Sequence, residues 1–465
     1  MERALIMTSI EVPSSAAEVQ AFFGTSRPSR RKWRALGRKI RKDVPHESLA
    51  ELPSERGDAL ALLARQERDR VPSLISLRRE RMSANQFAFL RGAALVMADD
   101  LSRTPQSGIT VQLCGDAHVA NFGLFASPER SLVFDLNDFD ETLPGPFEWD
   151  VKRMAASLVA AGQVNSHKDK QSRKAARAAV RTYRETMQVL CRMPTLDVWY
   201  AALSFDDLLA AVRKTPLGKS VAAAGRKAGK RTGDSAVAKL TEVVDGARRF
   251  LPDPPLLVPV PDEDRDQVQG DLAEIYAQYL ATLAPDRIAL LLRYSFADLA
   301  HKVVGVGSVG TLAAVVLLES GDKEPLILQV KQATQSVLEP YLAPSQFSEA
   351  GKRVVVGQRV LQTVGDPFLG WCHSFGEQPF DFYVRQLRDM KGSIDTAGLT
   401  PDALQVYAQV CGAVLARAHA RGGSAALIAG YLGDDETFDD AITDFATGYA
   451  SLNEHDLASL RAAMV

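Results

Sequence analysis

The stretch Val111–Glu141 reads VQLCGDAHVANFGLFASPERSLVFDLNDFDE, and the interpretation of the whole chain starts from it. An apolar run, Ile109–Leu113, predicts a strand that ends abruptly at Gly115-Asp116. A second apolar run, Leu132–Phe134, predicts another strand, which is followed at once by carboxylates. The ends of the two strands are therefore expected to present acidic side chains to one place.

The polar residues after these strands are of the types that phosphoryl transfer requires. One carboxylate orients or deprotonates an acceptor hydroxyl, and an asparagine with a second carboxylate holds Mg²⁺ on the nucleotide phosphates. Asp and Asn also form ordinary turns, so an acidic hairpin without a catalytic role is the simpler alternative. The candidates are Asp116 and Asn121 after the first strand, and Asp135, Asp138 and Asp140 after the second.

The order of these residues, Gly-Asp-x-His-x-x-Asn followed by Asp-Phe-Asp, resembles the catalytic and metal-binding loops of aminoglycoside phosphotransferases and other protein-kinase-like enzymes. The resemblance implies that Asp116 is the catalytic base, with His118 beside it as a second catalytic candidate. It also implies that Asn121 and Asp138 bind metal. Asp135 competes with Asp138 for the metal because both follow the same apolar run.

Asp150 precedes a helix that the apolar spacing predicts from about Val151 to Gly162, after the breaker Pro144-Gly145-Pro146. An aspartate there is expected at least to cap the helix. In kinase-like folds an aspartate in a comparable place braces the catalytic loop, and the resemblance implies this supporting role for Asp150.

A second motif lies much later, in the stretch AHKVVGVGSVGTLAAVVLLESGDKEPLILQVK that ends at Lys331. It contains a Gly-x-Gly-x-x-Gly pattern, which Rossmann folds and kinases share. A Rossmann loop opens a helix, whereas here the apolar run Leu312–Leu318, a turn at Ser320–Lys323 and a second run Leu326–Val330 predict a β-hairpin. The residues of the motif are Gly305, Gly307, Ser308 and Gly310.

Kinases cover ATP phosphates with a glycine flap between two antiparallel strands, and a lysine on the next strand pairs with the phosphates. The glycines let backbone N–H groups approach the phosphates, and Lys331 would supply a positive charge. A lysine in this role needs a carboxylate to hold it. Glu349, which we include in the predicted site, and Glu339 are the candidates, and the sequence does not choose between them.

Size and composition limit the class of protein. At 465 residues the chain exceeds what one hydrophobic core usually serves, so two lobes are expected. The net charge of −2 gives no general attraction to nucleic acid or to anionic membranes. The N-terminus does not resemble a signal peptide, no run of roughly 18 apolar residues occurs, and the four cysteines are far apart. We therefore expect a cytoplasmic protein without a membrane partner.

Four regions are expected along the chain. They are a basic N-terminal helical extension (1–83), a helical catalytic-loop region (84–250), a nucleotide-binding antiparallel sheet region (262–395), and C-terminal helices that pack on the catalytic lobe (396–465). The proline-rich segment Leu251–Pro261 suggests the lobe boundary, because proline is excluded from helix interiors and central strands. Pro216–Gly233 is rich in Gly, Ala, Lys and Arg and predicts an exposed, mobile loop. Thr400–Arg421 predicts a long helix stopped by Gly422-Gly423.

Five longer stretches resemble the bacterial family called domain of unknown function 2252, from about Arg78 onward. They are FAFLRGAALVMADDL, CGDAHVANFG, FDLNDFDETLPGPFEWDVKR, KVVGVGSVGT and YVRQLRDMKGS. In ordinary kinases the glycine flap and lysine precede the catalytic loop, and here they follow it. The expected fold is therefore α+β, two-lobed, kinase-like and circularly permuted, which is feasible because termini and loops often lie close together on a domain surface.

These observations predict an ATP- and Mg²⁺-dependent phosphotransferase with an unknown acceptor. The resemblance to the aminoglycoside enzymes favours a small molecule, while a protein acceptor or AMP transfer stays open. One alternative is a nucleotide-binding regulatory pseudokinase. Another is a metal-dependent hydrolase with a carboxylate-rich centre of Asp116, His118, Asp135 and Asp138. Nucleic-acid binding by the basic segments Arg27–Lys42 and Lys219–Arg231 is less expected, since no recognition fold is visible. The sequence does not indicate the oligomeric state.

Overall fold

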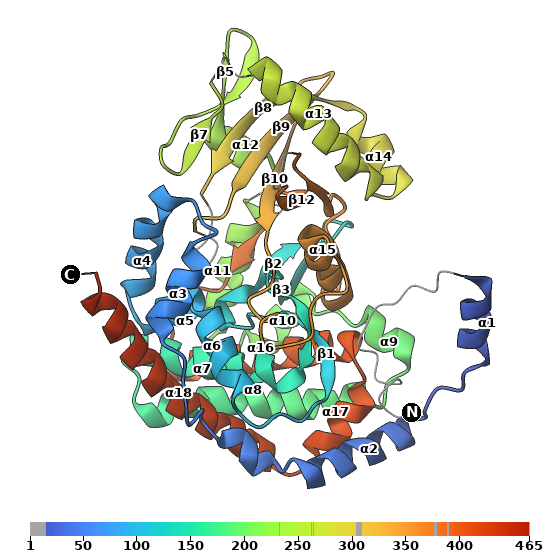
Figure 1. Ribbon diagram of the computed structural model, residues 1–465, viewed down its shortest axis with the longest axis vertical. Helices are drawn as coiled ribbons and strands as arrows, with labels where there is room; N and C mark the ends of the chain where they lie inside the picture. The colour runs from blue at the N-terminus through green and yellow to red at the C-terminus, as the bar shows by residue number, and fades with distance from the viewer. Residues whose placement is uncertain are drawn as a thin grey trace.

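The computed structural model describes residues 15–231, 233–261, 263, 265–303, 309–375, 379–387 and 390–464. Within them, an upper lobe built on an antiparallel sheet stands on a larger, mainly helical lower body (Figure 1). Helices and several small antiparallel sheets are combined in one chain, as expected for the α+β class.

The lower body consists of helices packed around two short sheets. In one sheet, β1 (Thr110–Leu113) pairs with β4 (Leu143–Pro146), and in the other the order is β13 (Gly392–Ser393), β2 (Phe122–Ala126), β3 (Leu132–Leu136). The helices that precede the first strand are α1 (Ala16–Gly24), α2 (Arg30–Asp43), α3 (Ala59–Glu67), α4 (Ile75–Ser83), α5 (Gln86–Gly92) and α6 (Ala94–Ser102). Those that follow are α7 (Phe147–Val164), α8 (Asp169–Leu190), α9 (Thr195–Tyr200), α10 (Phe205–Val212), α11 (Gly218–Gly229), α16 (Pro401–Gly422), α17 (Ala425–Leu432) and α18 (Thr437–Ala462).

The long helix predicted at the end of the chain is present as α16. Its N-cap, Thr400, accepts the backbone N–H of Ala403 with its side chain, and Pro401 occupies the first helical turn, where its missing N–H costs nothing. The buried face of α16 packs against α8 and α7. The C-terminal segment therefore completes the same core that holds the early strands.

The upper lobe is organised by a six-stranded antiparallel sheet of order β11-β12-β10-β9-β8-β7. Its strands are β7 (Leu257–Pro259), β8 (Tyr294–Lys302), β9 (Ala313–Ser320), β10 (Pro325–Ala333), β11 (Gly370–His373) and β12 (Asp381–Gln386). The flanking elements are α12 (Gly233–Leu240), the hairpin β5 (Thr241–Val244) and β6 (Ala247–Phe250), and α13 (Arg265–Ala281), α14 (Pro285–Leu291) and α15 (Ala350–Leu361).

Both faces of this sheet are covered, which explains why β9 reads as a continuous apolar run. Alternate residues of a strand point to opposite faces. Val316 and Leu318 join the cluster that includes α13 and α14, while Val315 and Leu317 join the cluster that includes α12 and β6. The predicted hairpin is therefore confirmed, with β9 and β10 antiparallel and Leu317 opposite Ile327.

Two expectations about irregular segments have different outcomes. The exposed loop expected over Pro216–Gly233 is wrong, because Gly218–Gly229 forms α11 and buries Val221 and Ala228. The proline-rich segment forms no helix or central strand, as expected, since it contributes β7, an edge strand of the upper sheet. It does not separate the lobes, because α12, β5 and β6, which precede it, already flank that sheet. None of the helices in the described ranges has the length and hydrophobicity needed to cross a bilayer.

Candidate functional site

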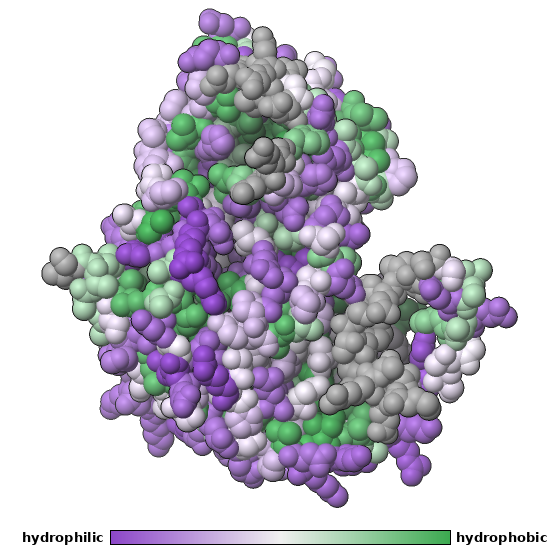
Figure 2. Space-filling view, in the orientation of Figure 1, coloured by the Kyte–Doolittle hydropathy of each residue, from purple (hydrophilic) through white to green (hydrophobic). Residues whose placement is uncertain are grey.

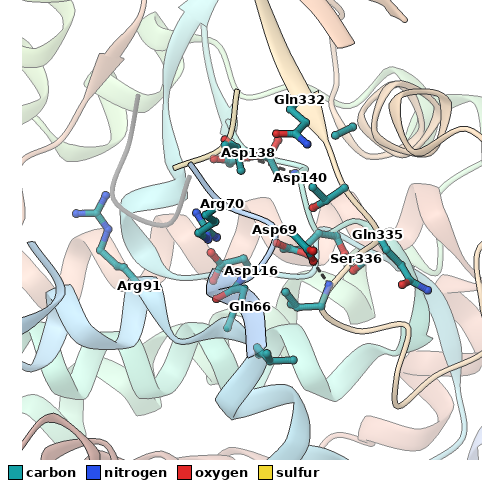
Figure 3. A pocket seen from close by; sticks show the side chains of 18 of the residues that line it. Gln66, Asp69, Arg70, Arg91, Asp116, Asp138, Asp140, Gln332, Gln335 and Ser336 are labelled. Atoms are coloured by element: carbon teal, nitrogen blue, oxygen red, sulfur yellow. Dashed lines mark hydrogen bonds between the residues drawn. The ribbon is translucent and has the colours of Figure 1, made fainter. Parts of the chain in front are cut away.

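A cavity of about 440 Å³ lies where the upper lobe meets the lower body. Hydrophilic residues gather at this junction in Figure 2. Figure 3 shows the acidic side chains of the early loops and the polar side chains that follow Lys331 in one view. Polar residues of three regions line the cavity: Arg65, Gln66, Asp69, Arg70 and Arg91; Asp116, His118, Asn121, Asp138, Asp140 and Glu141; and Thr311, Gln332, Thr334, Gln335 and Ser336.

Asp150 holds the loop that carries Asp116 in place through hydrogen bonds to its backbone. The Asp150 carboxylate accepts the backbone N–H of Cys114 at 2.8 Å and that of Gly115 at 3.1 Å. Gly115 has a φ of +84°, and a Cβ at this position would lie 2.2 Å from the carbonyl oxygen of Glu141, so only glycine fits. The expected bracing contact of Asp150 is present, whereas the capping role is wrong, because α7 begins at Phe147 without a side-chain cap.

Asp116 lies at the cavity wall with one carboxylate oxygen held by Arg153. The Nε of Arg153 donates to Asp116 Oδ1 at 2.8 Å, and its Nη2 donates to the carbonyl oxygen of Leu90. Burial raises the pKa of Asp116, and Arg153 opposes that rise. The carboxylate is thus oriented by a buried cation while its side chain remains 19% exposed.

His118 contacts Asp116 but is held as a neutral ring. Its Nε2 lies 3.5 Å from Asp116 Oδ2. Burial lowers the pKa of His118 well below its ordinary value, and the nearby Arg91 and Arg153 lower it further. The ring therefore carries no positive charge at neutral pH and can help to position Asp116.

Asn121 is positioned by a tight turn that follows Asp116. Its Nδ2 donates to the backbone carbonyl of Asp116 at 2.8 Å, and its backbone N–H donates to the carbonyl of His118. The side-chain nitrogen of Asn121 is thus used in a hydrogen bond, and its side-chain oxygen is the atom that can bind a hard cation such as Mg²⁺.

Asp138 and Asp140 lie on either side of the buried Phe139, and both line the cavity. Burial raises the pKa of Asp138, and the neighbouring Asp140 raises it further. Burial would also raise the pKa of Asp140, but Lys331 outweighs it and lowers the value to about 2. Asp140 is therefore a carboxylate at neutral pH, while Asp138 is the more readily protonated of the two.

Lys331, far along the sequence on β10, meets this acidic loop directly. Its Nζ lies 2.7 Å from Asp140 Oδ2, and Tyr383 donates its hydroxyl to Asp140 Oδ1 at 2.7 Å. The Lys331 side chain is only 4% exposed. The early acids and the late lysine are thus parts of one site.

The carboxylate that holds Lys331 is not one of the two glutamates considered from the sequence. Glu349 is the N-cap residue of α15, and its carboxylate lies 3.9 Å from His373 Nδ1. Glu339 accepts the backbone N–H of Ser336. Within the described residues, Asp140 is the ion-pair partner of Lys331, so the expected glutamate pairing is corrected.

Asp135, the competing metal candidate, does not line this cavity. Arg417 binds its Oδ1, and Thr363 donates both its backbone N–H and its hydroxyl to Oδ2. Its side chain is 1% exposed. Asp135 lies within β3, whereas Asp138 lies in the loop after the strand, and that loop reaches the cavity.

The described residues include only the end of the glycine motif. Gly305, Gly307 and Ser308 lie outside the described residues. Gly310 has a φ of +92°, and its carbonyl accepts the N–H of Val71 at 2.7 Å. The end of the motif therefore packs on the segment that carries Arg70.

Four arginines of the site were not predicted from the sequence: Arg70 and Arg91, which line the cavity, and Arg153 and Arg353, which hold residues that line it. Arg153 had a signal, since it is three residues after Asp150 on one helix face. Arg70, Arg91 and the buried Arg353 had none, because they are distant in sequence from the acidic loops. Asp140 was among the candidate carboxylates, but its pairing with Lys331 was not predicted. Arg353 donates to the carbonyl oxygens of Asp140 and Thr142 and so holds the acidic loop against α15.

The arrangement places oxygen ligands and an oriented aspartate around one cavity, and the buried Lys331 contacts Asp140 at the cavity wall. The described residues contain no group of three or more His, Cys, Asp or Glu that could hold a metal ion by themselves. Mg²⁺ in nucleotide sites is commonly bound by one or two carboxylates together with phosphate oxygens, so Asp138 and the oxygen of Asn121 fit that donor set.

Comparison with known proteins identifies one family. A family model described as an uncharacterized protein conserved in bacteria (DUF2252) matches residues 70–463. No curated protein and no solved structure matches the chain.

Proposed function

The chain belongs to this bacterial family, DUF2252, and we propose that it is an ATP- and Mg²⁺-dependent phosphotransferase of the kinase-like type with a small-molecule acceptor. One observation carries the proposal. Lys331 of the upper sheet lies 2.7 Å from Asp140, next to a cavity lined by Asp116, Asn121 and Asp138. A cation and an acidic loop facing each other across a junction of two lobes match the needs of a bound nucleoside triphosphate.

The order of elements in the upper lobe supports the same proposal. The segment with the glycine motif joins two antiparallel strands, β8 and β9, and the next strand, β10, carries Lys331. Helix α15 then precedes β11 and β12. Kinases use this succession of glycine-rich loop, lysine strand and helix. Because the acidic loops come first in this chain, we propose a circularly permuted kinase-like fold.

The residues would have separate roles. Asp138 and the oxygen of Asn121 would hold Mg²⁺, which neutralises charge on the transferred phosphoryl group. Lys331 would contact phosphate oxygens, and Asp140 keeps it charged and in place. Asp116 would accept a hydrogen bond from the acceptor hydroxyl, while Arg153 fixes the carboxylate in the orientation needed.

Binding tests the nucleotide half of the proposal. ATP with Mg²⁺ should raise the melting temperature of the wild type, because a ligand that binds only the folded state stabilises it. Asp138→Ala should abolish the Mg²⁺-dependent part of ATP binding in calorimetry. Asp322→Ala removes the same charge from an exposed turn between β9 and β10 and should bind as the wild type does. Equal Mg²⁺-dependent affinity in both variants would contradict the proposal.

Turnover separates an enzyme from the second candidate, a nucleotide-binding regulatory pseudokinase. One observation favours that candidate: α15 contains no carboxylate, so Lys331 takes its partner from the acidic loop instead. In an enzyme, ADP formation by Asp116→Asn should fall by about 10²- to 10⁴-fold, with ATP affinity retained. ATP binding by the wild type without ADP formation above the level of Asp116→Asn would indicate the pseudokinase.

A metal-dependent hydrolase with a centre of four residues is less well supported. Asp116, His118 and Asp138 line the cavity, but Asp135 is engaged by Arg417 and Thr363 elsewhere.

A further inference from the structure

Three arginines line the cavity, and the proposed function gives none of them a role. Arg65 donates to the hydroxyl of Tyr341, which leaves Arg70 and Arg91. Arg70 lies in the turn after α3, and Arg91 lies in the last turn of α5, so both come from the N-terminal part of the lower body. Figure 3 shows them on the left side of the cavity, with Gln335 and Ser336 on the right.

Neither guanidinium has a carboxylate of its own in the described structure. Arg70 donates through Nη1 to the carbonyl oxygen of Val309, and its buried Nε has no partner. The described contact of Arg91 is with the ring of Phe87, at 5.8 Å, and its Nε is likewise buried without a partner. Among the described residues, these are the contacts of the two guanidinium groups, so further donors of each are available to a ligand in the cavity.

Two of the acids whose charges act on these arginines have other cations as partners. Asp116 is held by Arg153 at 2.8 Å, and Asp140 by Lys331 at 2.7 Å. Asp138 is the proposed metal ligand. Burial lowers the pKa of Arg91, and the charges of Asp116 and Asp138 oppose that effect only in part. Arg91 is partly buried, and a cation withdrawn from water is unfavourable until an anion accompanies it.

The position of Arg91 indicates which substrate it faces. The two acids whose charges act on it are Asp116, which would receive the acceptor hydroxyl, and Asp138. A guanidinium presents a planar set of donors that fits a phosphate or a carboxylate with two parallel hydrogen bonds.

We propose that Arg70 and Arg91 bind an anionic group of the acceptor, so that the acceptor is a small hydroxyl compound carrying a phosphate or a carboxylate. This inference rests on the proposed phosphotransferase function, because it uses Asp116 as the place of the acceptor hydroxyl. It narrows the class of acceptor to hydroxyl compounds that carry an anionic group.

Binding of inorganic phosphate provides the test. The full-length protein is saturated with Mg²⁺ and a non-hydrolysable ATP analogue, so that the γ-phosphate position is filled, and phosphate is titrated by calorimetry. The wild type should bind phosphate. Arg91→Gln should weaken that binding about tenfold or more, the loss of one charge-assisted contact, while leaving affinity for the analogue unchanged. Arg91→Lys should restore part of the phosphate affinity, and Arg213→Gln, at an exposed position at the end of α10, should behave as the wild type.

The other possible results of the phosphate titration each decide between the anion site and an alternative. No phosphate binding to the loaded wild type, or equal binding by Arg91→Gln, overturns the anion site. A matching loss of affinity for the ATP analogue in Arg91→Gln overturns it in favour of a contact with nucleotide phosphates. If the analogue itself does not bind, the phosphotransferase proposal fails. In that case, phosphate binding to the unloaded protein that depends on Arg91 would still support an anion site.

A panel of acceptors then tests the substrate class. Glycerol, glycerate, glycerol 3-phosphate and ethanolamine each offer a hydroxyl with a different charge. ADP formation should be stimulated by glycerate or glycerol 3-phosphate and not by ethanolamine, and Arg91→Gln should remove that stimulation. Stimulation by ethanolamine that Arg91→Gln leaves intact would contradict the inference.

Discussion

At the scale of single residues, burial decides the charge states of the site more than sequence position does. Asp138, Asp140 and Glu141 are near neighbours in the sequence, yet their surroundings separate them. Lys331 lowers the pKa of Asp140 to about 2, whereas burial raises that of Glu141 to about 7. Glu141 accepts the N–H of Val337 at 2.8 Å, which opposes the rise without cancelling it.

Glu141 gives a prediction about stability and pH. Its folded-state pKa of about 7 is higher than the ordinary value of 4.5, so the folded protein holds this proton more tightly than the unfolded chain. The stability contributed by Glu141 is therefore fully present below about pH 4.5 and is lost as the pH rises through 7. Glu141→Gln does not titrate, so its unfolding free energy relative to the wild type should rise by about 2 kcal/mol from pH 4.5 to pH 8.

Thermal melts of both proteins across this range measure the difference. Glu129→Gln, at an exposed position before β3, serves as the matched control and should follow the wild type. A constant difference between Glu141→Gln and the wild type at all pH values would show that Glu141 ionises normally.

At the scale of elements, close helix packing depends on residues that carry little hydrophobic signal. Helix α11 is rich in glycine and alanine, and a Cβ on Gly225 would lie 2.1 Å from the ring of Phe205. The same small side chains that weaken the apolar periodicity allow the helix to approach its neighbours. This is why Pro216–Gly233 reads as a loop in the sequence and folds as a helix.

The crossing of α2 and α17 gives a prediction at this scale. These helices lie side by side at the bottom of the lower body in Figure 1, and a Cβ on Gly37 would lie 2.2 Å from the carbonyl oxygen of Leu427. Gly37→Val should therefore push the basic helix α2 away from α17. Overpacking against backbone should cost about 1–3 kcal/mol and lower the melting temperature. Gly24→Val, at the end of α1 with nothing within 4 Å, is the matched control. Equal melting temperatures for the two variants would mean that α2 is not held at this crossing.

At the scale of the whole molecule, the upper lobe and the lower body are joined through the acidic loop. Lys331 pairs with Asp140, and Arg353 of α15 donates to the backbone of the same residue at 2.8 Å. The chain returns to the lower body at β13, which pairs with β2. The contacts of Lys331 and Arg353 with Asp140 therefore both join the lobes and form part of the site.

The ion pair gives a prediction about coupling between the lobes. A double-mutant cycle of Lys331→Met and Asp140→Asn should give an interaction energy of about 1–3 kcal/mol, because the two side chains share one buried contact. Lys331→Met should also separate the melting of the upper lobe from that of the lower body in calorimetry. Lys323→Met, at an exposed position of the β9–β10 turn, should leave a wild-type melting profile. Additive effects in the cycle would show that the lobes are not coupled through this pair.

The sequence by itself determined the local parts of this protein. Strong periodic patterns predicted the β9–β10 hairpin, the helix α16 and the strands before Asp116 and Asp135, because the residues that set these elements are adjacent in the chain. Motif order also indicated Asp116, Asn121 and Asp138, which line the cavity together.

Only the tertiary structure decided which of these parts meet. In the tertiary structure Lys331 forms an ion pair with Asp140 and not with Glu349, and Asp135 forms an ion pair with Arg417. Arg70 and Arg91 line the cavity. Such contacts join residues far apart in the chain, and no local pattern encodes them. The physical reason is that burial and charge pairing depend on which elements pack together, whereas propensity and periodicity depend only on neighbours in the sequence.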